Sequence, residues 1–519
     1  MTEQLNMELS PNPKDHPNVS PWIDEQIWGH RLWDAQSSWL LFLEFLSVAE
    51  ACLRDNKLLD EESAHYPLVF YTYKRMYLRN ILFNNVELTR IGELQYQDAD
   101  GMWQMWIKWI NDNAQGVPIR DFSYLKGRFH SFNDFVTLIG MLRESAVESE
   151  TNRRWTSRFV FPFGPQGLYV DVNLGPSGKP AVEYINFGRT GEILYLMLCR
   201  AIHGPLLYEP IKNLLQGDNP WNQLLGLLQL ADAEKDLLER GHSYLPYLRH
   251  NIFDELADDW LSIFKLKLPR FDSVPHLVTL GAFHILLYQI TIATEWLQKG
   301  RKPHMICEVV APQKTLVREL SFINYQDNAD LPAQAVEAYI DNIEHSEEWQ
   351  KALKETGAYA SCYKILKERV WWPRKPEDYE GPEDPNRLIQ ELRTEALRGH
   401  RQHVAHVHRT YGREVGLVSK RGTTKLRYAP NDALLKTLIA ANVETRMELG
   451  EFLDCLYRRY GLVFGEKEAV QVLSNNEFDK KAFLANAERL EQRLSSLGML
   501  RRLSDSCAYV ENPYSWRTS

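Results

Sequence analysis

The stretch DKKAFLANAERLEQRLSSLGMLRRLSDSCAYVENPY, residues 479–514, decides the fold of the C-terminal region. Its first half predicts a helix that ends at Gly498, because glycine readily adopts the backbone conformation found at helix ends. Its second half predicts two strands, with Ser504, Asp505 and Ser506 at the turn between them. We therefore expect a helix followed by a two-stranded hairpin.

The residues before this stretch predict three further helices. Residues 431–443 begin with an Asn-Asp cap and show a helical apolar period, residues 447–461 are amphipathic, and residues 465–473 form a short third helix. Helices followed by a two-stranded wing make a winged helix-turn-helix, whose recognition helix enters the major groove of DNA. Residues 431–519 are therefore expected to form a winged-helix domain.

Basic residues of this domain are candidate contacts to DNA. They lie on the recognition-like helix and on the wing: Lys480, Lys481, Arg489, Arg493, Arg501 and Arg502. The domain as a whole is nearly neutral, with twelve Lys and Arg against thirteen Asp and Glu. Many winged helices pack against proteins, so a winged-helix scaffold that binds only protein is an alternative.

Residues 387–428 are far more basic. They carry ten Lys and Arg against three Glu, a net charge of +7 within a chain of net charge −9. Such clustering indicates a surface that binds a polyanion such as DNA. GLVSKRGTTKLRY, residues 416–428, predicts a β-hairpin that presents cations at its turn. The candidate nucleic-acid contacts are Arg401, Arg409, Arg413, Lys420, Arg421, Lys425 and Arg427. A solvated basic helix that pairs with the acidic residues 326–350 is the alternative.

Four histidines in this segment, His400, His403, His406 and His408, raise the question of a metal site. Residues three or four apart share one face of a helix, so some of these imidazoles could converge. However, structural metal sites usually contain Cys, and catalytic HExxH sites place a Glu between the ligands. The segment has neither feature, so we expect no metal ion and no other cofactor.

The sequence contains no complete catalytic motif. A Walker phosphate loop, a GxGxxG after a strand and a GxSxG elbow are all missing. A metal-dependent nuclease would place an Asp on one strand and Glu-x-Lys on the next. Asp171 and Glu183 lie on suitable predicted strands, but Tyr184 and Ile185 follow Glu183, so the Lys is missing. A divergent nuclease that uses Asp171 and Glu183 remains an alternative to a non-enzymatic protein.

The chain predicts a mainly α, multi-domain protein with a small β-sheet insertion and the C-terminal winged helix-turn-helix. A single hydrophobic core rarely grows beyond about 250–300 residues, and this chain has 519. The expected parts are a disordered lead-in (1–20), a helical domain (21–150), an α/β domain (151–320), a helical segment (321–372), a linker (373–385), a basic helix and hairpin (386–430) and the winged-helix domain (431–519).

Within these parts, apolar periods predict helices at Tyr66–Asn84, Met102–Asn113 and Phe132–Ser149, and another that begins at Thr190 or Gly191. Short β-branched runs bounded by Gly and Pro predict strands at 158–164, 167–175, 181–188 and 305–311. The tryptophans Trp22, Trp28, Trp33 and Trp39 predict a helical segment packed in a core, or an aromatic face that binds a partner.

Two features predict a cytoplasmic protein without a membrane segment. The first residues lack the basic start and apolar core of a signal peptide. The most apolar run, Leu277 to Trp296, is interrupted by His284, Gln289 and Glu295. These polar residues favour a buried helix over a membrane span.

Three stretches resemble a family of bacterial proteins encoded in multi-gene anti-phage defence islands. They are SPWIDEQIWGHRLWDAQSSWLLFLEFL (20–46), NFGRTGEILYLML (186–198), and RYGLVFGEKEA (459–469) together with LSDSCAYVENPY (503–514). The resemblance implies a system of either the methylation-associated or the phosphorothioation-associated type, and it implies no catalytic residues. It implies a role beside partner ATPases, nucleases or methyltransferases. The expected function is a non-enzymatic nucleic-acid-binding or scaffold subunit of such a complex.

Overall fold

A computed structural model describes most of the chain. The described residues are 23–30, 32–33, 37–83, 85, 87–94, 98–146, 160–169, 172–174, 180–182, 189–230, 237–300, 302–312, 314–373, 375–420, 425–474, 478–504 and 507–515. The described part is mainly helical, with 65% helix and 7% strand, which confirms the expected mainly α class.

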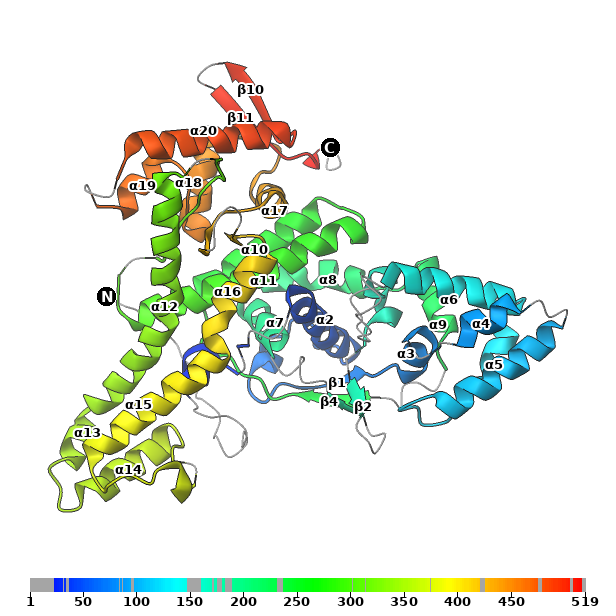
Figure 1. Ribbon diagram of the computed structural model, residues 1–519, viewed down its shortest axis with the longest axis horizontal. Helices are drawn as coiled ribbons and strands as arrows, with labels where there is room; N and C mark the ends of the chain where they lie inside the picture. The colour runs from blue at the N-terminus through cyan, green and yellow to red at the C-terminus, as the bar shows by residue number, and fades with distance from the viewer. Residues whose placement is uncertain are drawn as a thin grey trace. The chain divides into compact units, whose positions relative to one another are not determined.

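The chain divides into two compact units (Figure 1). The large unit comprises residues 1–38, 188–207 and 243–519, and the small unit comprises residues 39–187 and 208–242. This division differs from the domain borders expected from sequence, because residues on both sides of the proline-rich stretch 373–385 belong to one unit.

The small unit combines helices with two short ribbons. Its helices are α2 (Ser38–Arg54, which starts at the border), α3 (Met76–Phe83), α4 (Glu87–Glu93), α5 (Ala99–Asn113), α6 (Phe132–Ala146), α8 (Tyr208–Leu215) and α9 (Pro220–Leu227). Strand β1 (Val69–Tyr73) pairs antiparallel with β4 (Leu237–Gly241), and β2 (Val172–Leu174) pairs antiparallel with β3 (Pro180–Val182). Short 3-10 helices lie at η2 (Glu62–Ala64), η3 (Ser123–Arg128), η4 (Phe161–Phe163) and η5 (Pro165–Gly167).

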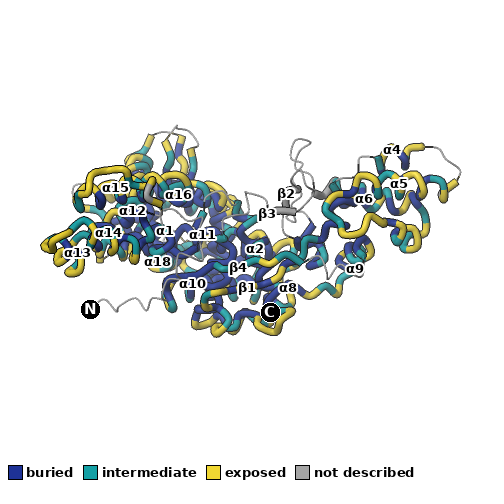
Figure 2. The backbone as a smooth tube through the Cα atoms, turned by 90° about the horizontal axis from the view of Figure 1, so that it is seen from below, coloured by how far each residue is buried: buried dark blue, intermediate teal, exposed yellow. Residues whose placement is uncertain are grey.

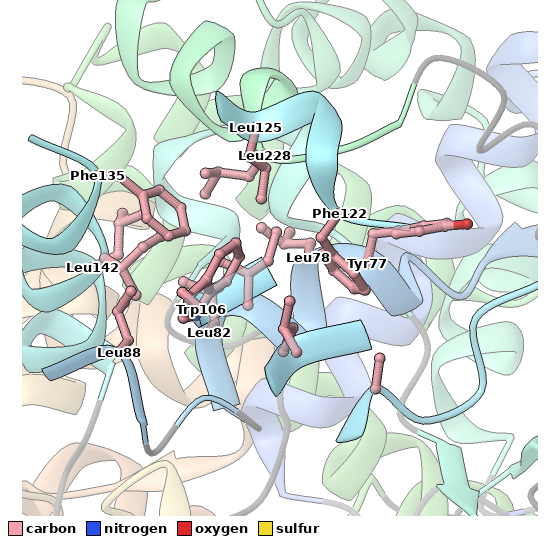
Figure 3. Packing of buried hydrophobic residues seen from close by; sticks show 14 of the residues in the cluster. Tyr77, Leu78, Leu82, Leu88, Trp106, Phe122, Leu125, Phe135, Leu142 and Leu228 are labelled. Atoms are coloured by element: carbon pink, nitrogen blue, oxygen red, sulfur yellow. The ribbon is translucent and has the colours of Figure 1, made fainter. Parts of the chain in front are cut away.

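The core of the small unit forms around Trp106 of α5. Phe122 and Phe135 lie edge-on against the Trp106 ring, and Leu82 lies in the same cluster (Figure 3). The Trp106 indole donates a hydrogen bond to Asn85 Oδ1 at 2.7 Å, which satisfies its buried N–H. The predicted helix at 102–113 is confirmed, and the one at 132–149 is confirmed up to Ala146, since residues 147–149 lie outside the described residues.

Two predictions in this unit are wrong in part. Residues 69–73, expected to be helical, form β1 because alternate side chains are buried and the backbone pairs with β4. The stretch 158–164, expected to be a strand, turns into η4 over its described part, since Pro162 interrupts a ladder of backbone hydrogen bonds.

The large unit is built mainly of helices. They are α1 (Ile23–Trp28), α7 (Thr190–Arg200), α10 (Asn251–Lys265), α11 (Arg270–Trp296), α12 (Leu316–Glu344), α13 (Glu347–Ala352), α14 (Ala358–Arg369), α15 (Pro385–Gln402) and α16 (Val404–Glu414), with 3-10 helices η7 (Gly204–Leu207) and η9 (Pro376–Asp378). Helix α7 begins at Thr190, as predicted. Strand β6 (Val418–Ser419) pairs antiparallel with β7 (Arg427–Tyr428), which confirms the predicted hairpin.

Helix α11 is long and apolar enough to cross a membrane by length and composition, and among the described residues it is the one helix of this kind. Its apolar window is 94% buried inside the protein, and Figure 2 shows it dark blue along most of its length. Its polar residues have internal partners: His284 Nε2 lies 2.7 Å from Asp259 Oδ2, and Gln289 donates to Val404 O at 2.6 Å. The prediction of a buried helix is confirmed.

The C-terminal elements follow the predicted order of helices and then a hairpin. They are α17 (Asp432–Asn442), β8 (Arg446–Glu448), α18 (Leu449–Tyr460), β9 (Leu462–Val463), α19 (Glu466–Val472), α20 (Lys480–Ser496), β10 (Leu500–Ser504) and β11 (Cys507–Glu511). Strands β10, β11 and β8 form an antiparallel sheet in that order, with α20 beside it (Figure 1).

Strand β9 pairs in parallel with β5 (Met305–Ile306) and so ties the C-terminal elements to the rest of the large unit. The strand predicted at 305–311 is only two residues long. Residues 308 and 309 form hydrogen bonds to other segments instead of continuing the ladder with β9. Glu308 N–H donates to Tyr428 O, and Val309 N–H donates to Asn486 Oδ1.

Candidate nucleic-acid interface

Helix α16 supplies the first part of the candidate interface. Its apolar side buries Val404, Val407 and Tyr411, which recur three or four residues apart and so share one face of the helix. The opposite face presents Arg409 and Arg413, both exposed and one turn apart. Neither arginine pairs with a carboxylate within the described part of the chain.

The hairpin β6–β7 lies against α16 and supplies Lys420 and Lys425. The close approach requires glycine at position 412, because a Cβ there would lie 2.6 Å from Val418 Cγ2. Strand β6 ends at Ser419, which pairs with Arg427 of β7. Lys420 therefore directly follows β6, and Lys425 lies two residues before β7. Both lysines are exposed.

Helix α12 provides an aromatic floor beneath these cations. The ammonium of Lys425 lies 4.2 Å from the centre of the Phe322 ring, a cation–π contact. Tyr325, one turn further, lies near Arg409 and Arg413. Burial raises the pKa of Tyr325 to about 12, and the two arginines oppose this rise. We call the exposed set Arg409, Arg413, Lys420 and Lys425 the basic face.

A buried, neutral histidine supports this floor. The His408 ring stacks on Tyr325 with 5.0 Å between ring centres, and its Nε2 lies 2.9 Å from the Tyr428 hydroxyl. Asn328 donates to that hydroxyl at 3.0 Å, so the hydroxyl in turn donates to His408 Nε2. Burial lowers the pKa of His408 to about 4, which leaves the imidazole uncharged at neutral pH. The positive charge of the surface therefore comes from arginine and lysine.

Two other predicted contacts of this segment lie elsewhere. Arg427 is completely buried and forms an ion pair with Glu308, whose other oxygen accepts from Arg318 Nε at 2.7 Å. It is an internal residue and not part of the basic face. Arg401 is exposed in the last turn of α15. The predicted contact Arg421 lies outside the described residues.

The four histidines do not converge. His400 is buried, with Nδ1 2.8 Å from Asp24 Oδ1, and the His403 ring packs on Trp33 with 3.9 Å between ring centres. His408 faces α12 instead. Within the described residues, no group of three His, Cys, Asp or Glu side chains is placed to hold a metal ion.

Three of the six predicted contacts near the C-terminus form ion pairs within the protein. Lys480 pairs with Glu466 at 3.3 Å, Arg493 with Asp432 at 2.6 Å, and Arg502 with Glu491 at 3.6 Å. Arg489 is half-buried. Lys481 and Arg501 are exposed, and neither has an ion-pair partner within the described part of the chain.

The proposed nuclease pair, Asp171 and Glu183, lies outside the described residues. Phe322 and Tyr325 were missed by the sequence-based argument, which considered charge and not the aromatic residues of a neighbouring helix. Their spacing from Arg318 places all three on one face of α12, a signal that could have indicated this surface.

The chain matches no protein-family model, no curated protein and no solved structure.

Proposed function

We propose that this chain is a non-enzymatic, cytoplasmic subunit of a bacterial anti-phage defence complex and that it binds nucleic acid through the basic face. The observation that carries the proposal is the exposure of Arg409 and Arg413 on adjacent turns of α16, without a carboxylate partner in the described part of the chain. Cations that are not neutralised internally are available to displace counterions from a phosphate backbone. The neighbouring Glu414 is occupied, since its Oε2 accepts from the Ser38 N–H at 2.5 Å.

The placement in a defence complex rests on the resemblance of three stretches to proteins of such islands. Their partner ATPases, nucleases or methyltransferases would supply the chemistry. This subunit would hold DNA and the partners together. The net charge of −9 opposes binding by the rest of the surface, so contact is confined to the basic face.

The proposal is tested by fluorescence anisotropy with a labelled DNA duplex at low salt. Arg409→Gln together with Arg413→Gln should weaken binding by roughly tenfold per phosphate contact at about 50 mM salt. A matched control, Lys375→Gln with Arg387→Gln, removes the same charge from an exposed part of the chain outside the basic face. Equal weakening in both variants would mean that net charge alone, and not this surface, governs binding.

We further propose that residues 431–519 form a winged helix that contacts protein and not DNA. The order α17, β8, α18, α19, α20, β10, β11 and the sheet order β10-β11-β8 support the winged-helix assignment. Three of its six candidate basic residues form ion pairs within the protein, whereas Leu484 on α20 and Leu503 on β10 are 38% and 58% exposed. Exposed apolar side chains favour a protein partner.

Co-purification with the neighbouring gene products tests this second proposal. Leu484→Glu with Leu503→Glu should abolish capture of a partner while the protein stays folded. Leu227→Glu is the matched control, because Leu227 is 39% exposed and lies in the small unit. Undiminished capture by the double variant would remove the winged helix as the docking site.

A further inference from the structure

A cavity of about 620 Å³ lies in the large unit along α12. It is bounded by α12, by Thr294 of α11, by Lys299, residues 302–304 and Ile306, and by the end of α19. Pockets of about 300–1,000 Å³ are the usual size for small ligands. The cavity is separate from the basic face, because neither Phe322 nor Tyr325 lines it.

The cavity has an apolar end and a polar end. The residues that line it from α12 recur three or four apart and share one face of the helix: Leu320, Ile323, Asp327, Asp330 and Gln334. With about 1.5 Å per residue, this wall is roughly 21 Å long. Val472 and Leu473 complete the apolar end, and Lys299 lies beside Gln334 at the other.

The wall is held in place by hydrogen bonds from buried amides. Asn324 accepts from Ile306 N–H at 2.8 Å and donates to His304 O at 3.2 Å. Asn328 donates to the same carbonyl at 2.8 Å. These bonds fix residues 304–306 against α12, so the cavity is preformed and requires no rearrangement to accept a ligand.

The lysines of the cavity already have partners within the protein. Lys302 Nζ lies 2.9 Å from Glu255 Oε1 and donates to Arg458 O at 3.3 Å, and Lys299 donates to Gln334 at 3.2 Å. In contrast, the carboxylates of Asp327 and Asp330 form neither a hydrogen bond nor an ion pair with any described residue. Among the described residues, the cavity therefore offers two carboxylates that no cation pairs with.

An apolar contact surface lies next to these carboxylates. Ile323, one helical turn before Asp327, is 48% exposed. Leu320, three residues before Ile323, is 9% exposed. A carboxylate beside apolar surface suits a cation on an apolar stem, because the stem covers the surface while the charge is paired. A phosphate or carboxylate ligand would meet like charge at Asp327 and Asp330.

We propose that this cavity binds an organic cation, a guanidinium or alkylammonium group carried on an apolar stem. Asp327 and Asp330 receive the cation, and Ile323 and Leu320 contact the stem. The cation can be a free small molecule or the Arg or Lys side chain of a partner. The inference is independent of nucleic-acid binding, because the basic face is on the other side of α12.

Isothermal titration calorimetry with two probes tests the proposal. Agmatine represents the free cation, and an acetylated, amidated Leu-Ala-Ala-Arg peptide represents a partner side chain. Asp327→Asn with Asp330→Asn should weaken binding at least tenfold. Glu337→Gln is the control, because Glu337 is exposed on the same helix and does not line the cavity.

Each outcome is informative. Carboxylate-dependent binding of agmatine supports a free cation as the ligand, and carboxylate-dependent binding of the peptide alone supports a partner side chain. If neither probe binds at millimolar concentration, the proposal is overturned. Equal binding by the Asp-to-Asn variant and by Glu337→Gln would overturn it as well, since the cation would then bind elsewhere.

Discussion

Arg427 and Glu308 form an ion pair in which both side chains are completely buried. Arg427 comes from the hairpin next to α16, and Glu308 follows the two-residue strand β5. Glu308 also binds Arg318 of α12, so one carboxylate joins three segments of the large unit. This arrangement removes one arginine from the basic segment and uses it to fix the hairpin that carries Lys420 and Lys425.

Arg427→Met should strongly destabilise the protein. The variant leaves the buried Glu308 with only part of its compensation, the ion pair with Arg318, and breaking a buried ion pair by removing one partner typically costs about 3–5 kcal/mol. The shift of the urea midpoint measures the effect. Glu368→Gln, which breaks the exposed pair with Lys364, is the control and should cost less than about 1 kcal/mol. A midpoint for Arg427→Met that equals the control would contradict the buried position of Arg427.

Gly412→Ala should destabilise the protein, although alanine is a better helix former than glycine. The new Cβ would lie 2.6 Å from Val418 Cγ2 and 3.3 Å from Leu286 Cδ1, so α16 would be pushed from the hairpin. Gly140→Ala in α6 is the matched control, because its Cβ would meet nothing within 4 Å. That substitution should stabilise by about 0.5–1 kcal/mol. Thermal melting of the two variants should therefore shift in opposite directions.

Acidification should weaken the fold through His408. Its pKa falls from 6.5 to about 4 on folding, so the folded protein excludes a proton that the unfolded chain accepts. The contribution is full above pH 6.5 and is lost as the pH falls toward 4. Linkage predicts a loss of roughly 2 kcal/mol between pH 7 and pH 5. Urea denaturation at both pH values should show a smaller difference for His408→Leu than for the wild type, and an equal difference would refute the assignment.

Proteolysis in the stretch 373–385 should leave the two fragments associated. Most of its described residues are exposed, which favours cleavage. However, Tyr379 packs edge-on against Trp372, and α14 and α15 on either side contact one another and α13 or α12. Size-exclusion chromatography of the nicked protein should give one peak. Two separate fragments under native conditions would support an independent C-terminal domain instead.

Local patterns predicted local structure well. The cap at Asn431, the helix ends at Gly461 and Gly498 and the apolar periods between them mark α17, α18 and α20 correctly. These signals depend on neighbouring residues in the chain, so a single sequence contains them. The strand at 69–73 was missed because its partner, residues 237–241, is remote in sequence. Two strands that are so far apart in the sequence leave no local pattern that identifies their pairing, apart from the alternation of buried and exposed side chains.

The candidate site could be predicted only in part. Net charge marked the segment 387–428, and its exposed cations Arg409, Arg413, Lys420 and Lys425 form the basic face. Charge alone did not separate these from Arg427, because burial depends on the position of Glu308, 119 residues away along the chain. The aromatic floor from α12 was missed for the same reason. The pairing of Arg493 with Asp432 likewise required the tertiary structure.

The dependence of DNA binding on salt tests the central claim most directly. Each phosphate contact contributes about 0.9 to the slope of log binding constant against log salt concentration on B-DNA. Replacing Arg409 and Arg413 with Gln should therefore flatten the slope by roughly 1.8. The control, Lys375→Gln with Arg387→Gln, should keep the slope of the wild type. An unchanged slope in the arginine variant, or no salt-dependent binding by the wild-type protein alone or with the neighbouring gene products, would contradict binding through the basic face.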